Sequence, residues 1–140
     1  MESKVGYLQM IQNVISRMAS NSFLLKGWTV TLVVGLFAFA NISEMSSKFI
    51  LLSFIPTLIF WSLDGFFIHQ ESLFIKLYEK ATQEDDENIT FSMKVDSFKA
   101  ESRGWLGSMF SVTLLLFYPP LILVISAAVF LMPKINLAWI

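Results

Sequence analysis

The chain of 140 residues contains no cysteine, a single histidine and few charged residues. Without cysteine it forms no disulfide and no thiolate metal site, and one histidine rules out a multi-histidine metal centre within one chain. The formal net charge of −1 gives no basic field that would attract nucleic acid. Gly-rich phosphate loops, nucleophile elbows and HExxH motifs are also missing. The sequence therefore predicts no enzymatic activity, no cofactor, no metal and no nucleic-acid partner.

What the chain has in excess is apolar sequence, because 55% of its residues are hydrophobic and only 15% are charged. Soluble domains average about 25% charged residues. The charges stand in blocks, and the gaps between them are long enough to cross a membrane, which takes about 20 mostly apolar residues. We therefore predict an all-α integral membrane protein of one domain with three transmembrane helices. These spans cover residues 23–42, 49–70 and 106–132.

The polar segments complete the predicted layout. Apolar residues recur at helical spacing over 1–22, which predicts an amphipathic helix that lies on the membrane surface or packs on a partner helix. The short polar turn at 41–48 joins the first two spans in a hairpin. The helical pattern of the second span continues to about Thr82, so we expect this helix to extend into the cytoplasm, where helix and loop occupy 71–104. Alternation over 89–96 is typical either of a short strand or of an extended loop packed on that helix.

The basic residues predict the orientation of the chain. With a cytoplasmic N-terminus, eight of the ten Lys and Arg residues face the cytoplasm, and only Lys48 and Lys134 face outward. Short cytoplasmic loops are enriched in Lys and Arg. We therefore predict a multi-pass protein with its N-terminus inside and its C-terminus outside. Trp28 and Trp105 are then expected near the inner interface, and Trp139 near the outer one.

Asp64 is the main candidate for a functional residue. A charge inside a span costs about 2.5–3.5 kcal/mol on insertion scales, so it normally faces protein or water. Ser53 and Thr57 share its helix face, which predicts either the lining of a hydrated path or a helix–helix seam held by hydrogen bonds. Lys26 begins the antiparallel neighbour at the same end of the membrane. We therefore expect an ion pair between Lys26 and Asp64.

Prolines interrupt two of the three predicted spans. Pro56 lies within the second, and Pro119 and Pro120 lie within the third. Each proline removes a backbone donor and disfavours the helical conformation in the residue before it. We expect the third span to bend or break near Tyr118, either as a hinge or gate or as a fixed packing kink.

The stretch 8–28, LQMIQNVISRMASNSFLLKGW, together with the hairpin and the FWSLD stretch at 60–64, resembles a group of small uncharacterised bacterial membrane proteins. Their layout is similar to that of SLATT-type proteins: an N-terminal helix, a tight two-span hairpin and a cytoplasmic helix. The resemblance rests on this layout and on the sequence around Lys26 and Asp64, and the third apolar run departs from it. It implies a protein of the bacterial inner membrane and a pore-forming effector in nucleotide-signalled antiviral defence.

Two classes of function follow from these features. The first is a homo-oligomeric channel or membrane-disrupting effector, in which kinked helices or the Ser53–Thr57–Asp64 face surround the path, since one chain is too small to enclose a pore. The second is a membrane anchor or scaffold that recruits a soluble partner through residues 70–104. The mixed charges and spare apolar side chains of that segment suit contact with a protein. Both classes have the lipid bilayer as a partner.

Overall fold

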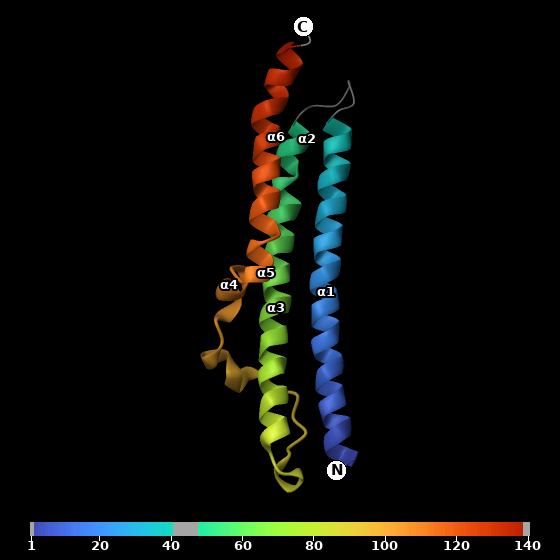
Figure 1. The fold of residues 1–140 in the computed structure, drawn as a ribbon, viewed down its shortest axis with the longest axis vertical. Coiled ribbons are helices and arrows are strands. Elements are labelled where there is room, and N and C mark those ends of the chain that lie inside the picture. The colour runs from blue at the N-terminus through green and yellow to red at the C-terminus, as the bar shows by residue number, and fades with distance from the viewer. Residues whose placement is uncertain (1, 41–47, 139–140) are drawn as a thin grey trace.

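The architecture is that of an elongated bundle of helices (Figure 1). The computed structural model describes residues 2–40 and 48–138 and places side chains over 2–40 and 50–131. Residues 41–47 of the turn predicted at 41–48, and Trp139, lie outside the described residues. The elements are α1 (Glu2–Ala40), α2 (Lys48–Leu52), α3 (Phe54–Gln83), η1 (Asp86–Asn88), η2 (Asp96–Glu101), α4 (Gly104–Met109), α5 (Val112–Leu115) and α6 (Tyr118–Ala138).

Helix α1 is a single unbroken helix of 39 residues, which is about 58 Å long at 1.5 Å per residue. The sequence predicts a separate helix over 1–22, but the structure has no break at residues 22 and 23. No proline interrupts this stretch, so nothing removes a backbone donor there. Its N-terminal part packs along the C-terminal part of α3, with Tyr7 and Ile11 buried against Leu73 and Leu77. Of the two predicted placements, the structure therefore has packing on a partner helix.

The second apolar segment is α2 followed by α3, with a local break at Ser53. Pro56 has no N–H to donate to the carbonyl of Leu52, four residues earlier, so the regular helix is interrupted there. Hydroxyl groups donate to two other carbonyls beside this break. Ser53 donates to the Ile50 carbonyl from both its backbone N, at 3.1 Å, and its Oγ, and Thr57 Oγ1 donates to the Ser53 carbonyl at 2.7 Å.

The third apolar segment, predicted as a span over 106–132 with a bend or break near Tyr118, is divided into α4, α5 and α6, so the predicted break is confirmed and a second one is added. Pro119 and Pro120 cannot donate to the carbonyls of Leu115 and Leu116, so α5 ends at Leu115 and the chain starts a new helix at Tyr118. The prolines occupy the first turn of α6, where a helix needs no intrahelical donor. The break near Tyr118 is therefore a helix start, and a second break separates α4 from α5.

Three helical segments are long and apolar enough to cross a membrane within the described residues: Glu2–Ala40, Ile50–Gln83 and Val112–Leu131. Large exposed apolar side chains gather along one part of each. Most of them occupy residues 23–39, 51–66 and 105–131, which we call the apolar band, and Val5, Met10, Ile75 and Phe91 lie outside it. Inside the band, Val33, Ile50 and Ile125 form a small core that joins the three segments. So many exposed apolar side chains around such a small core mark a surface that contacts a membrane or another protein.

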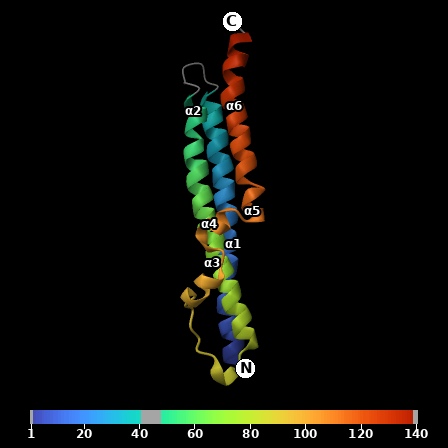
Figure 2. The same cartoon turned by 90° about the vertical axis from the view of Figure 1, so that its left-hand side faces the viewer.

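Beyond the apolar band, α1 and α3 continue side by side (Figure 1), and the connecting chain runs beside them (Figure 2). We call residues 2–22, 67–83 and the connecting chain 84–103 the stem. In the connecting chain Ile89 and Val95 are buried against α3, and the residues from 89 to 95 form an extended loop and not a strand. Phe91 adopts a left-handed backbone with φ of 56°, which interrupts the alternation that a strand requires.

Candidate functional site: a buried ion pair at the edge of the apolar band

Side chains from three helices meet at Asp64, whose exposed fraction is 0%. Lys26 Nζ of α1 lies 2.7 Å from Asp64 Oδ2, so the structure brings together the two charges that the sequence analysis paired. Ser22 Oγ, one turn earlier on α1, donates to Asp64 Oδ1. The Tyr118 hydroxyl, at the start of α6, donates to Asp64 Oδ2 at 3.0 Å. We call these four residues the Asp64 cluster.

The cluster is balanced in charge and well provided with hydrogen bonds. Lys26 Nζ donates both to Asp64 and to Ser22 Oγ, at 2.7 and 2.8 Å, which uses two of its three N–H groups. The carboxylate accepts from Lys26, Ser22 and Tyr118. A buried charge is tolerated when it is paired and its remaining lone pairs are satisfied. The arrangement therefore holds α1, α3 and α6 together without leaving a net charge in the apolar surroundings.

The cluster lies near one edge of the apolar band and not at its centre. Phe23, which begins the band on α1, is one turn from Lys26, and Phe66, which ends it on α3, is two residues from Asp64. The Lys26 side chain keeps 16% exposure. A lysine at such a depth can extend its ammonium group toward the polar interface, which lowers the cost of its charge.

The other predicted members of the polar face lie deeper in the band. Ser53 and Thr57 have exposed fractions of 0%, and their hydroxyls donate to carbonyls of their own helix. Together with Asp64 they face the inside of the bundle. The arrangement corresponds to a seam between helices of one chain, because within the described residues this face has no contact with solvent or lipid.

Sequence reasoning missed Ser22 and Tyr118 as members of the cluster. Ser22 stands four residues before Lys26, so the two share a helix face, and that spacing was a usable signal. Tyr118 precedes the two prolines. Its place in the cluster depends on the start of α6 at this residue, which the sequence does not specify. Its ring stacks on Trp61 at 6.0 Å between centroids with an interplanar angle of 5°, which fixes the direction of its hydroxyl.

Helix α4 is held against α3 by two tryptophans and a glycine. Trp61 Nε1 donates to the Met109 carbonyl at 2.7 Å, and Trp105 Nε1 donates to the Ser62 carbonyl at 2.8 Å. Gly65 allows the close approach, since a Cβ atom there would lie 2.4 Å from Met109 Cγ. This contact places α5 and the start of α6 beside Asp64, so it positions the Tyr118 hydroxyl.

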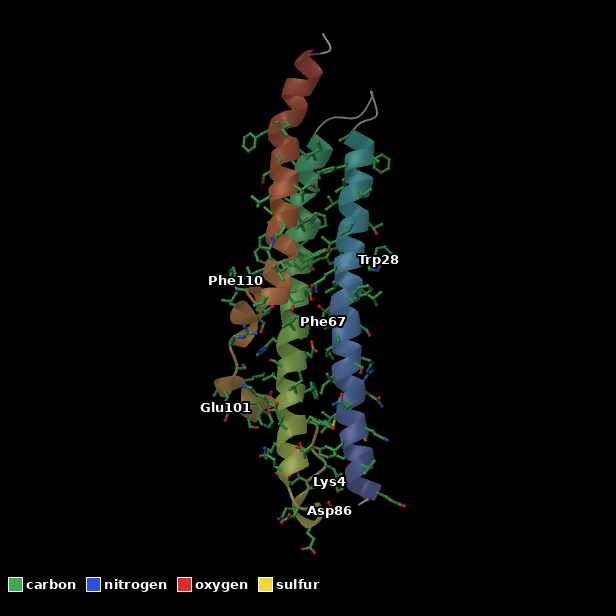
Figure 3. The ribbon with its side chains drawn as sticks, in the orientation of Figure 1. Lys4, Trp28, Phe67, Asp86, Glu101 and Phe110 are labelled. Atoms are coloured by element: carbon green, nitrogen blue, oxygen red, sulfur yellow. The ribbon has the colours of Figure 1, made fainter. Side chains whose placement is uncertain are left out.

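The second feature of interest is the outer end of the stem. There Lys4 Nζ donates to the carbonyl of Glu84 at 2.6 Å and lies 3.9 Å from Asp86, so the first turn of α1 fastens the loop after α3 (Figure 3). Beside this contact is a cavity of about 330 Å³ with both charges and hydroxyl groups at its walls. Its lining includes Tyr7, Lys80, Glu84, Ser92, Lys94, Asp96 and Phe98.

Comparisons of this chain with protein-family models, with curated proteins and with solved structures find no significant match. What the fold defines is therefore a class: an all-helical chain, over its described residues, with three helices long and apolar enough to cross a membrane. The resemblance to SLATT-type proteins stays a prediction.

Proposed function

We propose that this protein is a membrane anchor that holds the stem on the cytoplasmic face and presents its outer end to a soluble partner. The proposal rests on the burial and internal hydrogen bonding of the polar face in the apolar band. Ser53, Thr57 and Asp64 are fully buried and bonded within one chain. A face whose polar groups are already satisfied supports a rigid helix seam better than the lining of a hydrated path.

The stem provides the surface that an anchor needs. From Phe67 to Gln83, α3 extends about 25 Å beyond the apolar band at 1.5 Å per residue, and α1 runs beside it. The loop 84–103 is packed on this pair through Ile89 and Val95, so the stem has an apolar core of its own. A stem with its own core can present the cavity at its outer end in a fixed shape.

The proposed topology follows from the charges on the stem side. Eight of the ten basic residues lie on the stem or at the neighbouring edge of the apolar band, whereas Lys48 begins α2 and Lys134 lies in the C-terminal part of α6, both at the opposite end (Figure 1). The bias toward basic residues on the cytoplasmic side therefore puts the stem and the N-terminus inside and the C-terminus outside. The absence of cysteine allows a direct test by labelling of single introduced cysteines.

The topology experiment uses Ser97→Cys in the stem loop and Ser46→Cys between the first two spans. In intact cells a membrane-impermeant maleimide should label the second variant and leave the first unlabelled until the membrane is opened. Labelling of Ser97→Cys in intact cells would contradict the cytoplasmic stem.

Anchoring is tested by photo-crosslinking in living cells. A photoreactive amino acid replaces Ser97 beside the stem cavity, and the matched control carries it at Leu123, an exposed residue of α6 in the apolar band. We expect a discrete adduct with a soluble protein from the stem position and none from the control. Adducts only with a second copy of the chain, or equal adducts from both positions, would contradict the proposal.

A second candidate, a homo-oligomeric pore or membrane-disrupting effector, is favoured by one observation. The third apolar segment is broken on both sides of α5, and Tyr118 at the second break bonds directly to Asp64. Straightening this segment would pull the hydroxyl from the carboxylate and free a polar group in the spans. The role in bacterial antiviral defence would belong to this candidate.

Release of an enclosed dye from liposomes separates the two candidates. The pore candidate requires leakage by the purified protein that changes in Asp64→Asn, with Asp96→Asn in the stem as the control. Vesicles that stay sealed at all protein densities, with a particle mass of one chain, favour the anchor.

A further inference from the structure

A groove of about 310 Å³ opens beside the Asp64 cluster, between α1 and α3 and next to α5. Its lining mixes apolar and polar side chains. Ala19, Phe23 and Ile68 are the apolar ones, and Ser22, Lys26, Glu71 and Thr113 are the polar ones. The groove therefore places two charged side chains, Lys26 and Glu71, at the edge of the apolar band.

The charges in this groove do not cancel. Lys26 is matched by Asp64, at 2.7 Å, whereas the half-buried carboxylate of Glu71 makes neither an ion pair nor a hydrogen bond with any described residue. Lys26 also attracts Glu71, but one ammonium group cannot neutralise two carboxylates, so Lys26, Asp64 and Glu71 together carry one net negative charge. Lys26 also keeps one N–H group that its two hydrogen bonds, to Asp64 and Ser22, do not use. A ligand with an ammonium group and a neighbouring anion would complement both the Glu71 carboxylate and the unused N–H group of Lys26.

The depth of the groove matches a lipid headgroup. Phe23 at its rim has an exposed fraction of 77% and belongs to the first turn of the apolar band. Glu71 stands five residues beyond Phe66, about 7.5 Å along the helix, and the polar zone on each side of the hydrocarbon core is about 5–8 Å thick. Acyl chains beside Phe23 would leave the headgroup level with Glu71.

We propose that this groove binds phosphatidylethanolamine from the surrounding membrane leaflet. Its ammonium group donates to the Glu71 carboxylate, its phosphate accepts the free N–H of Lys26, and its acyl chains run past Phe23 along the apolar band. Phosphatidylcholine lacks the N–H donors, and phosphatidylglycerol brings a negative charge toward Glu71 without an amine. The proposal is independent of the soluble partner, because it concerns the edge of the apolar band and not the outer end of the stem.

The experiment counts lipids on the full chain by native mass spectrometry after delipidation in a mild detergent. Phosphatidylethanolamine, phosphatidylcholine and phosphatidylglycerol of the same acyl chains are added in turn. We expect one phosphatidylethanolamine per chain at the lowest concentrations, with an apparent affinity at least about tenfold above that of the other two, as suits a charge-assisted hydrogen bond.

The test variant is Glu71→Gln, which removes the charge and keeps the shape, and the matched control is Glu79→Gln on the exposed side of α3. Glu71→Gln should lose the preference for phosphatidylethanolamine, and Glu79→Gln should keep it. Equal binding of the three lipids by the wild type, or an unchanged preference in Glu71→Gln, overturns the proposal. A particle of two chains that Glu71→Gln separates would assign the groove to a second copy and also overturn it.

Discussion

Replacement of Asp64 by asparagine should destabilise the bundle strongly, because it leaves the charge of Lys26 without its partner. Removal of one member of a buried ion pair typically costs about 3–5 kcal/mol. Lys26 keeps 16% exposure and stands near the edge of the apolar band, so its ammonium group can move toward the interface. We therefore expect the free energy of unfolding to fall by an amount near the lower end of this range, about 3 kcal/mol. The measurement is unfolding by added SDS in mixed micelles, followed by tryptophan fluorescence.

The double variant Lys26→Leu with Asp64→Leu separates the ion pair from the rest of the site. Replacement of both charges by apolar groups removes the uncompensated charge, so the double variant should be more stable than Asp64→Asn alone. Asp96→Asn is the control, since its ion pair with Lys99 lies on the surface of the stem and should contribute little. Wild-type stability of Asp64→Asn, or a double variant as unstable as the sum of the two single variants, would refute this reasoning.

Three further substitutions test the contacts around the cluster by the same unfolding measurement. Gly65→Ala should cost about 1–3 kcal/mol of unfolding free energy, since its Cβ would meet Met109 Cγ at 2.4 Å. Gly35→Ala is the control and should not destabilise, because a Cβ there has nothing within 4 Å. Equal effects of the two variants would contradict the packing argument. Tyr118→Phe should cost about 1.5–3 kcal/mol because the carboxylate loses a donor, and an unchanged stability would exclude that bond. Leu73→Ala in the stem core should cost about 2–5 kcal/mol, and a smaller loss would mean that the stem packs loosely.

The sequence alone predicted the helical class, three apolar segments and the continuation of α3 beyond its span, to Gln83 in the structure. These features depend on local properties: the length of uncharged runs and the 3.6-residue period of apolar side chains. The sequence also predicted the proximity of Lys26 and Asp64, because an antiparallel hairpin with predicted boundaries puts residues of matching depth opposite each other.

Tertiary structure decided the features that depend on distant contacts. Periodicity over residues 2–22 fits a helix on a membrane or on a partner equally well, and only the buried contact of Ile11 with α3 selects the second. Prolines indicate a break but not whether the chain bends or restarts. Tyr118 could not be assigned to Asp64 from sequence, since the hydroxyl reaches the carboxylate across 54 residues only after Gly65 admits α4 and Trp61 orients the ring. The local sequence pattern determines which helices form. Contacts between distant residues, among them the hydrogen bonds of the buried Asp64 carboxylate, determine how the helices pack.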